Sequence, residues 1–133
     1  MNHVPSENPT AVLVVEDEPM VRALAVDILE EAGFDVIEAA TADYAVTVLD
    51  KRSDIRVVFT DIHMPGKLNG LELARLIDDH FHQIRVIIGS GKARPGPDEI
   101  SPRALFIPKP YSTAALVAAV QGMAAASGRN AFQ

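Results

Sequence analysis

The feature that most constrains the fold of this chain is an alternation of short apolar runs with amphipathic segments. Five runs have the length and composition of strands: 11–15, 34–39, 56–60, 84–89 and 104–107. Strands that alternate with helices predict a doubly wound α/β fold, in which helices cover both faces of a five-stranded parallel sheet. The first, third and fourth runs are apolar almost throughout, as centrally buried parallel strands are.

Residues that favour helix ends separate these runs. They are Pro19 and Gly33 for the first helix, Thr41 for the second, Asn69 with Glu72 for a third over 70–81, and Ser112 for the last. Each helix also has an apolar stripe, which is expected to face the sheet. The stripe residues are Val21, Leu24, Ala25, Ile28 and Leu29; Ala42, Ala45, Val46 and Leu49; Leu71, Ala74, Ile77 and Phe81; and Leu116, Ala119, Val120, Met123 and Ala124.

Chain length and charge limit the classes of function. The 133 residues predict one domain over 11–126, with a disordered arm at 1–10 and a flexible tail at 127–133. The formal net charge of −6 argues against non-specific binding to nucleic acid or to an anionic membrane. Cysteine is absent, no apolar run approaches the roughly 20 residues that span a bilayer, and the polar N-terminus does not have the pattern of a signal peptide. A cytoplasmic protein is therefore expected.

Acidic residues follow two of the expected strands. Glu16 and Asp17 come directly after the first strand, and Asp61 comes after the third. Because ligands of such sheets bind beyond the carboxyl ends of the strands, we expect these three carboxylates to meet at one edge. Carboxylates at close range repel one another, and the charge of a divalent cation offsets this repulsion. Mg²⁺ suits such a site because it prefers oxygen ligands. The pattern therefore predicts a Mg²⁺ site.

Two further groups are expected at the same edge. Ser90 ends the fourth strand, and Lys109 follows the fifth. A carboxylate, a hydroxyl and an ammonium group around a metal ion form a site suited to phosphoryl transfer. We assign Asp61 as the nucleophile that forms an aspartyl phosphate, while Lys109 and Ser90 contact the phosphoryl oxygens.

These residues lie within motifs that spread over about residues 11–126. The motifs are Val14-Val15-Glu16-Asp17, Asp61 with Met64-Pro65-Gly66, Asn69-Gly70-Leu71-Glu72-Leu73, Ser90-Gly91 and Lys109-Pro110. Together, at these spacings, they resemble the receiver domains of two-component response regulators. The resemblance implies a flavodoxin-like sheet with the strand order 2-1-3-4-5.

The resemblance also implies partners and metal ligands. Asp61 would accept a phosphoryl group from a histidine of a sensor histidine kinase or of a histidine phosphotransfer protein. Asp17 and Asp61 would bind Mg²⁺ directly, Glu16 would bind it through water, and His63 would bind it through its backbone carbonyl. The protein would then be a phosphoacceptor, with slow self-dephosphorylation, rather than a turnover enzyme.

The resemblance further implies a switch that responds to phosphorylation. Ser90 would be the switch hydroxyl, and Phe106 would be the switch aromatic residue, three positions before Lys109. Phosphorylation would shift both between two states and so change binding to a downstream protein. The bond between Lys109 and Pro110 is expected to be cis, which is an uncommon state of such bonds.

Two side chains flank the expected phosphorylation site. His63 lies two residues after Asp61, and Lys92 lies two residues after Ser90. We expect both to tune the lifetime of the phosphoryl group. Replacement of either should change the rate of hydrolysis several-fold without abolishing phosphorylation.

The segment 91–103 departs from the family pattern, which has a helix between the fourth and fifth strands. It contains three prolines and two glycines in 13 residues, and proline in a helix interior costs about 3 kcal/mol. The fourth helix of the family is therefore expected to be shortened or replaced by a loop, with at most a single turn near 98–101. We expect this loop to be mobile and to become ordered on phosphorylation or partner binding.

Alternatives remain open at this point. The chain fits a stand-alone receiver, a receiver from a hybrid histidine kinase, or a scaffold whose binding does not depend on phosphorylation. An aspartyl-phosphate phosphatase would need a second aspartate where His63 stands, and a flavin or nucleotide binder would need a phosphate-binding loop where the acidic segment 16–19 lies. The small outer residues of the last helix, with Val117, form either an ordinary solvent face or a packing face for a partner or a homodimer.

Overall fold

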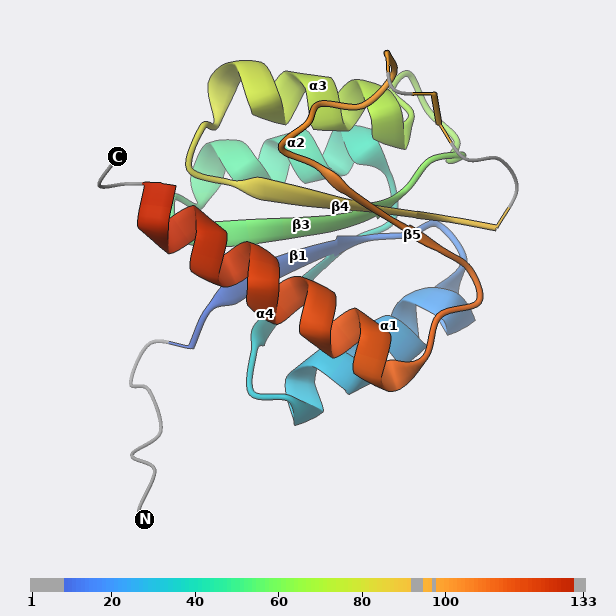
Figure 1. Cartoon of the computed structure of the whole chain (residues 1–133). Coiled ribbons are helices and arrows are strands. Elements are labelled where there is room, and N and C mark those ends of the chain that lie inside the picture. The colour runs from blue at the N-terminus through green and yellow to red at the C-terminus, as the bar shows by residue number, and fades with distance from the viewer. Residues whose placement is uncertain (1–8, 92–94, 97, 131–133) are drawn as a thin grey trace.

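The computed structural model describes residues 9–91, 95–96 and 98–130, in which five strands and four helices form one layered unit (Figure 1). The strands are β1 (Ala11–Val15), β2 (Asp35–Ala39), β3 (Ile55–Asp61), β4 (Arg85–Ser90) and β5 (Leu105–Pro108). The helices are α1 (Pro19–Glu31), α2 (Ala42–Lys51), α3 (Gly70–His80) and α4 (Thr113–Asn130). All strand pairs are parallel and the order is β2-β1-β3-β4-β5, which confirms the predicted fold.

Alternate side chains of the central strands point to opposite faces of the sheet, and each face is covered by two helices (Figure 1). Leu13, Val58 and Ile88 belong to the cluster that packs against α2 and α3, whereas Val12, Val57 and Ile87 belong to the cluster that packs against α1 and α4. The central strands are therefore buried on both sides. This explains why their sequences are apolar throughout rather than alternating.

The predicted helix ends are confirmed by their hydrogen bonds. The side chain of Asn69 accepts from the N–H of Glu72 at 2.9 Å, and the side chain of Glu72 accepts from the N–H of Asn69 at 2.8 Å, so that α3 begins with a complete capping box. Thr41 accepts from the N–H of Tyr44 at 3.0 Å at the start of α2. Ser112 caps α4 in the same way through the N–H of Ala115.

Some details of the core differ from the helical stripes read from the sequence. Leu24 is expected from its spacing to face the core, but its relative exposure is 59%, and Val26 is buried instead. Val48 and Leu73 are buried core residues that the stripes do not include. These differences arise because the side of a helix that becomes buried depends on how the helix lies across the sheet, and not on periodicity alone.

The last helix overlaps the segment 127–133, whose expected flexibility stays a prediction. Helix α4 continues to Asn130, so the helix passes the position at which the flexible tail is expected to begin. Ser127 is buried, and its hydroxyl donates a hydrogen bond to the backbone carbonyl of Gln83. This contact between α4 and the segment before β4 holds the last turns of the helix against the domain.

The described part of the segment between β4 and β5 contains turns and no helix, in agreement with its proline and glycine content. The N–H of Glu99 donates to the carbonyl of Gly96, and the N–H of Ala104 donates to that of Ser101. Lys92 lies outside the described residues, as does most of the arm at 1–10. The mobility expected for 91–103 stays a prediction.

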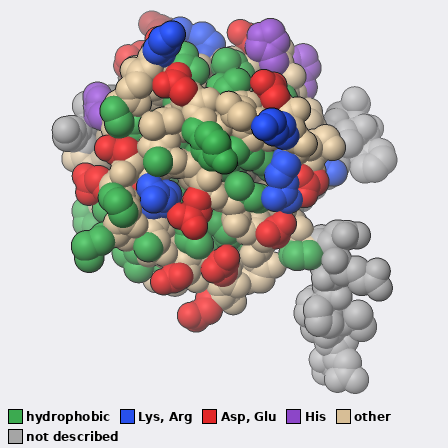
Figure 2. All heavy atoms as spheres, turned by 180° about the vertical axis from the view of Figure 1, so that it is seen from behind, with side chains coloured by type: hydrophobic (Ala, Val, Ile, Leu, Met, Phe, Trp, Pro, Cys, Tyr) green, Lys and Arg blue, Asp and Glu red, His purple; other side chains and the backbone are tan. Residues whose placement is uncertain are grey.

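The surface carries charges of both signs. On the face seen in Figure 2, acidic and basic side chains are interspersed with small groups of hydrophobic ones. None of the described helices is long and apolar enough to cross a membrane.

Candidate functional site

The carboxyl edge of the sheet brings the predicted site residues together. The parallel register places Val15 beside Thr60, Asp61 beside Gly89, and Ser90 beside Pro108. Each of four neighbouring strands therefore ends at nearly the same level. The residues that end or follow these strands are Glu16 and Asp17, Asp61, Ser90, and Lys109.

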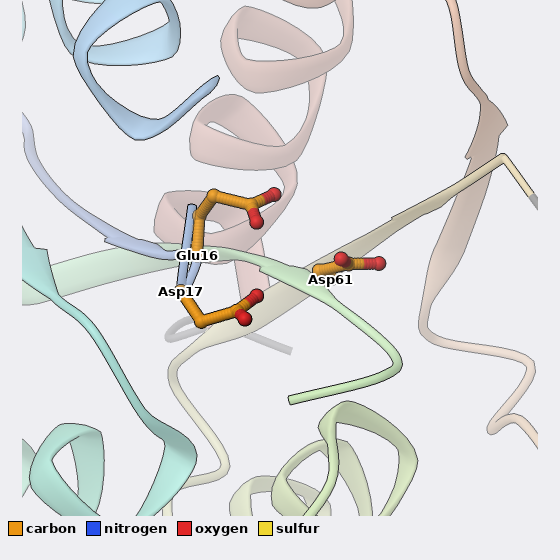
Figure 3. Close-up of side chains that lie close together, drawn as sticks. All are labelled: Glu16, Asp17 and Asp61. Carbon is orange, nitrogen blue, oxygen red and sulfur yellow. The ribbon is translucent and has the colours of Figure 1, made fainter. Parts of the chain in front are cut away.

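Three carboxylates gather at this edge. Glu16 and Asp17 follow β1, Asp61 ends β3, and Figure 3 shows their side chains grouped at the ends of these strands. Each residue offers one oxygen such that the three atoms lie within 4.8 Å of one another. Oxygen atoms of carboxylates are ligands that Mg²⁺ prefers, so the donor set fits this ion.

Glu16 is the most enclosed of the three acids, with a relative exposure of 5%. Its Oε1 accepts a hydrogen bond from Lys109 Nζ at 2.8 Å, and its Oε2 accepts one from the N–H of Glu18 at 3.2 Å. Burial raises the pKa of Glu16 above its ordinary value, although the hydrogen bond from Lys109 opposes this. A cation bound beside Glu16 would favour its ionised form.

Asp61 is held at the end of β3 with one oxygen directed toward Lys109. Its Oδ1 accepts a hydrogen bond of 2.7 Å from the N–H of Ile62, and its Oδ2 lies 3.5 Å from Lys109 Nζ. The side chain is 17% exposed, so the carboxylate is accessible although its surroundings are largely formed by protein. This combination suits a group that reacts with an incoming phosphoryl donor.

Lys109 reaches both acidic groups from the end of β5. The backbone N–H of Lys109 donates to the backbone carbonyl of Ser90 at 3.0 Å. The peptide bond between Lys109 and Pro110 is cis, as predicted. Burial by itself lowers the pKa of the Lys109 ammonium group, but the hydrogen bond to Glu16 and the charges of Asp61 and Glu16 outweigh it, so that the pKa is raised. Lys109 therefore carries its positive charge at neutral pH.

These residues surround a pocket of about 450 Å³. Its lining residues are Asp17, Glu18, Val21, Asp61, His63, Ser90, Gly91 and Lys109. The side chain of His63 is exposed at the rim, and Ser90 is buried with a relative exposure of 4%. Phe106 lies outside the pocket lining and is partly buried against the core beneath α2 and α3.

Glu18, Val21 and Gly91 line the pocket but are not assigned to the site from the sequence. Val21 carries a misleading signal, because its helical spacing places it on the core stripe of α1. Glu18 and Gly91 are neighbours of predicted residues, and only the path of the backbone shows that they reach the pocket.

A second, apolar pocket of about 410 Å³ adjoins the first. Its lining residues are Val21, Leu24, Gly91, Lys109, Pro110 and Tyr111, of which three also line the acidic pocket. Met20, with 85% exposure, and Leu24 place further apolar surface on the same helix. Contiguous exposed apolar surface is typical of sites that contact another protein or a ligand.

Comparison with known families decides what this arrangement is. The family model described as "Response regulator receiver domain" matches residues 12–121. The chain belongs to the receiver domain family. The five motifs named above lie within this range, and the receiver domain resemblance read from them is confirmed.

Curated relatives place the receiver domain within two-component signalling. The chain is 33% identical over 113 residues to the nitrogen assimilation regulatory protein NtrX of Azorhizobium caulinodans, a match that covers 80% of this chain and 24% of that protein. It is 32% identical over 116 residues to the sensor kinase CckA of Brucella abortus, a match that covers 84% of this chain and 12% of that protein. The chain thus spans about a quarter or less of the length of these two relatives.

Solved structures agree with the fold. A response regulator receiver protein from Sinorhizobium medicae superposes with a TM-score of 0.85, covering 92% of this chain and 99% of that one at 24% sequence identity. At this identity the likeness supports the receiver fold only.

Proposed function

We propose that this receiver domain takes a phosphoryl group from a phosphohistidine onto Asp61, with Mg²⁺ bound by Glu16, Asp17, Asp61 and the backbone carbonyl of His63. The observation that supports this most strongly is the position of Lys109 Nζ, which lies 2.8 Å from Glu16 and 3.5 Å from Asp61. A cation held between a candidate metal ligand and a candidate nucleophile is placed to bind an anionic group there.

The proposed transfer is a displacement at phosphorus. A carboxylate oxygen of Asp61 forms the new O–P bond while the P–N bond to the donor imidazole breaks and its electron pair returns to the ring nitrogen. Lys109 binds one phosphoryl oxygen, and the hydroxyl of Ser90 donates a hydrogen bond to another. When bound, Mg²⁺ supplies positive charge that offsets the charge of the phosphoryl group.

The proposed output is a change of protein–protein contacts. The phosphoryl group adds up to about two negative charges at pH 7, and these attract the hydroxyl of Ser90. Phe106 and the segment after β4 then shift between two states, which changes the surface offered to a downstream protein in the cytoplasm. The likeness to the sensor kinase CckA, and to a solved receiver domain from the hybrid histidine kinase CckA, supports a hybrid kinase receiver as an alternative setting for the same chemistry.

A test of this proposal is the intact mass of the protein after incubation with acetyl phosphate and Mg²⁺. We expect one added phosphoryl group with Mg²⁺ and none after addition of EDTA. Absence of an adduct from folded protein, both with acetyl phosphate and with a phosphorylated histidine phosphotransfer protein, would favour the scaffold alternative.

The apolar pocket beside Lys109 supports a protein as the phosphoryl donor. Replacement of Leu24 by Glu adds a charge to this exposed surface, so we expect transfer from a histidine kinase that labels the wild-type chain to slow at least ten-fold. Labelling by acetyl phosphate should not change, because this small donor does not need the surface. Tyr44→Glu, at an exposed residue of α2, is the matched control. Equal slowing with both donors would contradict this prediction.

We expect His63, which lines the acidic pocket, to act on the phosphoryl group after transfer. The side chain of His63 is exposed at the pocket rim, so His63→Ala should leave labelling intact. The substitution should change the rate of phosphoryl loss about three- to ten-fold. This effect is smaller than that of a group that transfers a proton in the transition state. After the acetyl phosphate has been removed by gel filtration, the decay of the phosphorylated mass in the presence of Mg²⁺ measures this rate. The corresponding prediction for Lys92 is tested in the same way with Lys92→Ala. An unchanged rate of phosphoryl loss in both variants would contradict the proposal that these two residues tune the lifetime of the phosphoryl group.

A further inference from the structure

Arg22 of α1 joins the acidic residues to the neighbouring strand β2. Its Nη1 donates a hydrogen bond of 2.8 Å to the backbone carbonyl of Glu16, and its Nε donates one of 3.0 Å to Oε1 of Glu38. The Arg22 side chain is 20% exposed and that of Glu38 is 51% exposed. The guanidinium group thus connects α1, the residue after β1, and β2.

The Glu16 backbone is held on its other side as well. Its N–H donates to the carbonyl of Ala39, the last residue of β2, at 3.0 Å. Both side-chain oxygens of Glu16 accept hydrogen bonds, from Lys109 and from the N–H of Glu18. The hydrogen bond from Arg22 to the carbonyl of Glu16 adds a further restraint at the residue that precedes Asp17.

We propose that Arg22, oriented by Glu38, is a positioning residue that holds the acidic segment 16–18 in the arrangement that binds Mg²⁺. This inference rests on the proposed function, because it assigns a role toward the same metal ion. A segment already held in its binding conformation loses less freedom when the ion binds, so the affinity is higher. The planar fork of arginine contacts the carbonyl and the carboxylate together, whereas a lysine ammonium group, as a compact point charge, cannot reproduce this geometry.

Charge has to be kept constant in the test. Loss of the positive charge at Arg22 would by itself strengthen the attraction of the acidic residues for Mg²⁺ and mask a loss of positioning. Arg22→Lys keeps the charge and breaks the two-sided contact. Glu38→Asp keeps the other charge and shortens the side chain by one methylene group, which withdraws the carboxylate from Nε.

Arg52 offers a matched control. It also joins two carboxylates, at 2.7 Å to Asp54 and 3.3 Å to Asp35, but these residues lie at the amino ends of β3 and β2, on the edge of the sheet opposite the site. Arg52→Lys therefore breaks a similar surface contact without touching the acidic segment.

The experiment is a calorimetric titration of each full-length variant with MgCl₂. We expect Arg22→Lys and Glu38→Asp to bind Mg²⁺ about three- to ten-fold more weakly, which is at or below the lower limit of the roughly 10- to 100-fold losses typical when groups that orient metal ligands are replaced. Arg52→Lys should stay within two-fold of the wild type. At saturating Mg²⁺, labelling of Arg22→Lys by acetyl phosphate should return to the wild-type rate, which a general loss of folded protein would not allow.

The outcomes separate this inference from the proposed function. Wild-type affinity in both Arg22→Lys and Glu38→Asp would overturn the inference and leave the proposed function intact. An equal loss in Arg52→Lys would also overturn it, because the effect would then not depend on the acidic segment. A wild-type protein that binds no Mg²⁺ would overturn both the inference and the proposed metal site.

Discussion

Asp61→Asn is expected to abolish the phosphoryl adduct. The amide lacks the charge and the nucleophilicity of the carboxylate, and no second carboxylate in the described structure lies both at the end of β3 and beside Lys109. Incubation with acetyl phosphate and Mg²⁺ should therefore leave the mass of Asp61→Asn unchanged, whereas the wild type gains one phosphoryl group. The expected loss is total rather than partial, because the bond to phosphorus has no other acceptor at this position.

The fold should survive this change. The amide oxygen of the introduced asparagine can still accept the hydrogen bond from the N–H of Ile62, and removal of one of three clustered negative charges reduces their mutual repulsion. The control is Asp54→Asn, since Asp54 is exposed and pairs with Arg52 away from the site. Labelling of Asp54→Asn should equal that of the wild type. An adduct on Asp61→Asn would place the phosphoacceptor at another residue and reject the proposed chemistry.

Gly70→Ala is expected to damage stability and the site together. A Cβ atom at Gly70 would lie 1.8 Å from the carbonyl oxygen of Asp61 and 2.9 Å from the Cα of Ile62. Both are backbone atoms that cannot rotate away, so α3 or the end of β3 has to move. Overpacking typically costs about 1–3 kcal/mol, and we expect a loss of about 3 kcal/mol from the free energy of unfolding measured in urea.

The same substitution should also slow phosphorylation. The N–H of Gly70 donates to the carbonyl of Ile62 at 2.8 Å, so the start of α3 is bonded to the segment that carries Asp61. Movement there changes the distance between Asp61 and Lys109. Gly122→Ala is the control, because nothing lies within 4 Å of a Cβ at this exposed position of α4, and alanine there should stabilise the helix by up to about 1 kcal/mol. Equal stability of the two variants would contradict the argument.

Much of the fold could be predicted from local patterns. The five apolar runs correspond to five strands with boundaries shifted by a residue or less, and the capping box of Asn69 and Glu72 starts α3 as expected. The proline and glycine content of the segment after β4 correctly indicates that turns replace a helix in its described part. These features depend on interactions between residues that are close in the sequence, so they can be predicted from local sequence patterns.

Two features of the structure that the sequence patterns do not predict have a common cause. Leu24 has the spacing of a core residue, yet α1 lies across the sheet so that Leu24 lines an open pocket beside Pro110 and Tyr111. Ser127 of α4 donates a hydrogen bond to Gln83, which lies 44 residues earlier in the chain. Periodicity and composition contain no information on where such distant segments meet.

The sequence by itself determined the succession of strands and helices along the chain. It also determined the chemical groups that follow the strands, which are carboxylates, a hydroxyl and a lysine. Only the tertiary structure decided how these groups meet. Lys109 contacts Glu16 across 93 positions of the chain, Arg22 reaches Glu38, and the missing side chain of Gly70 lets α3 approach Asp61. The physical reason is that local structure follows from interactions between near neighbours, whereas site geometry follows from sheet order, register and side-chain packing, which couple residues far apart in the sequence.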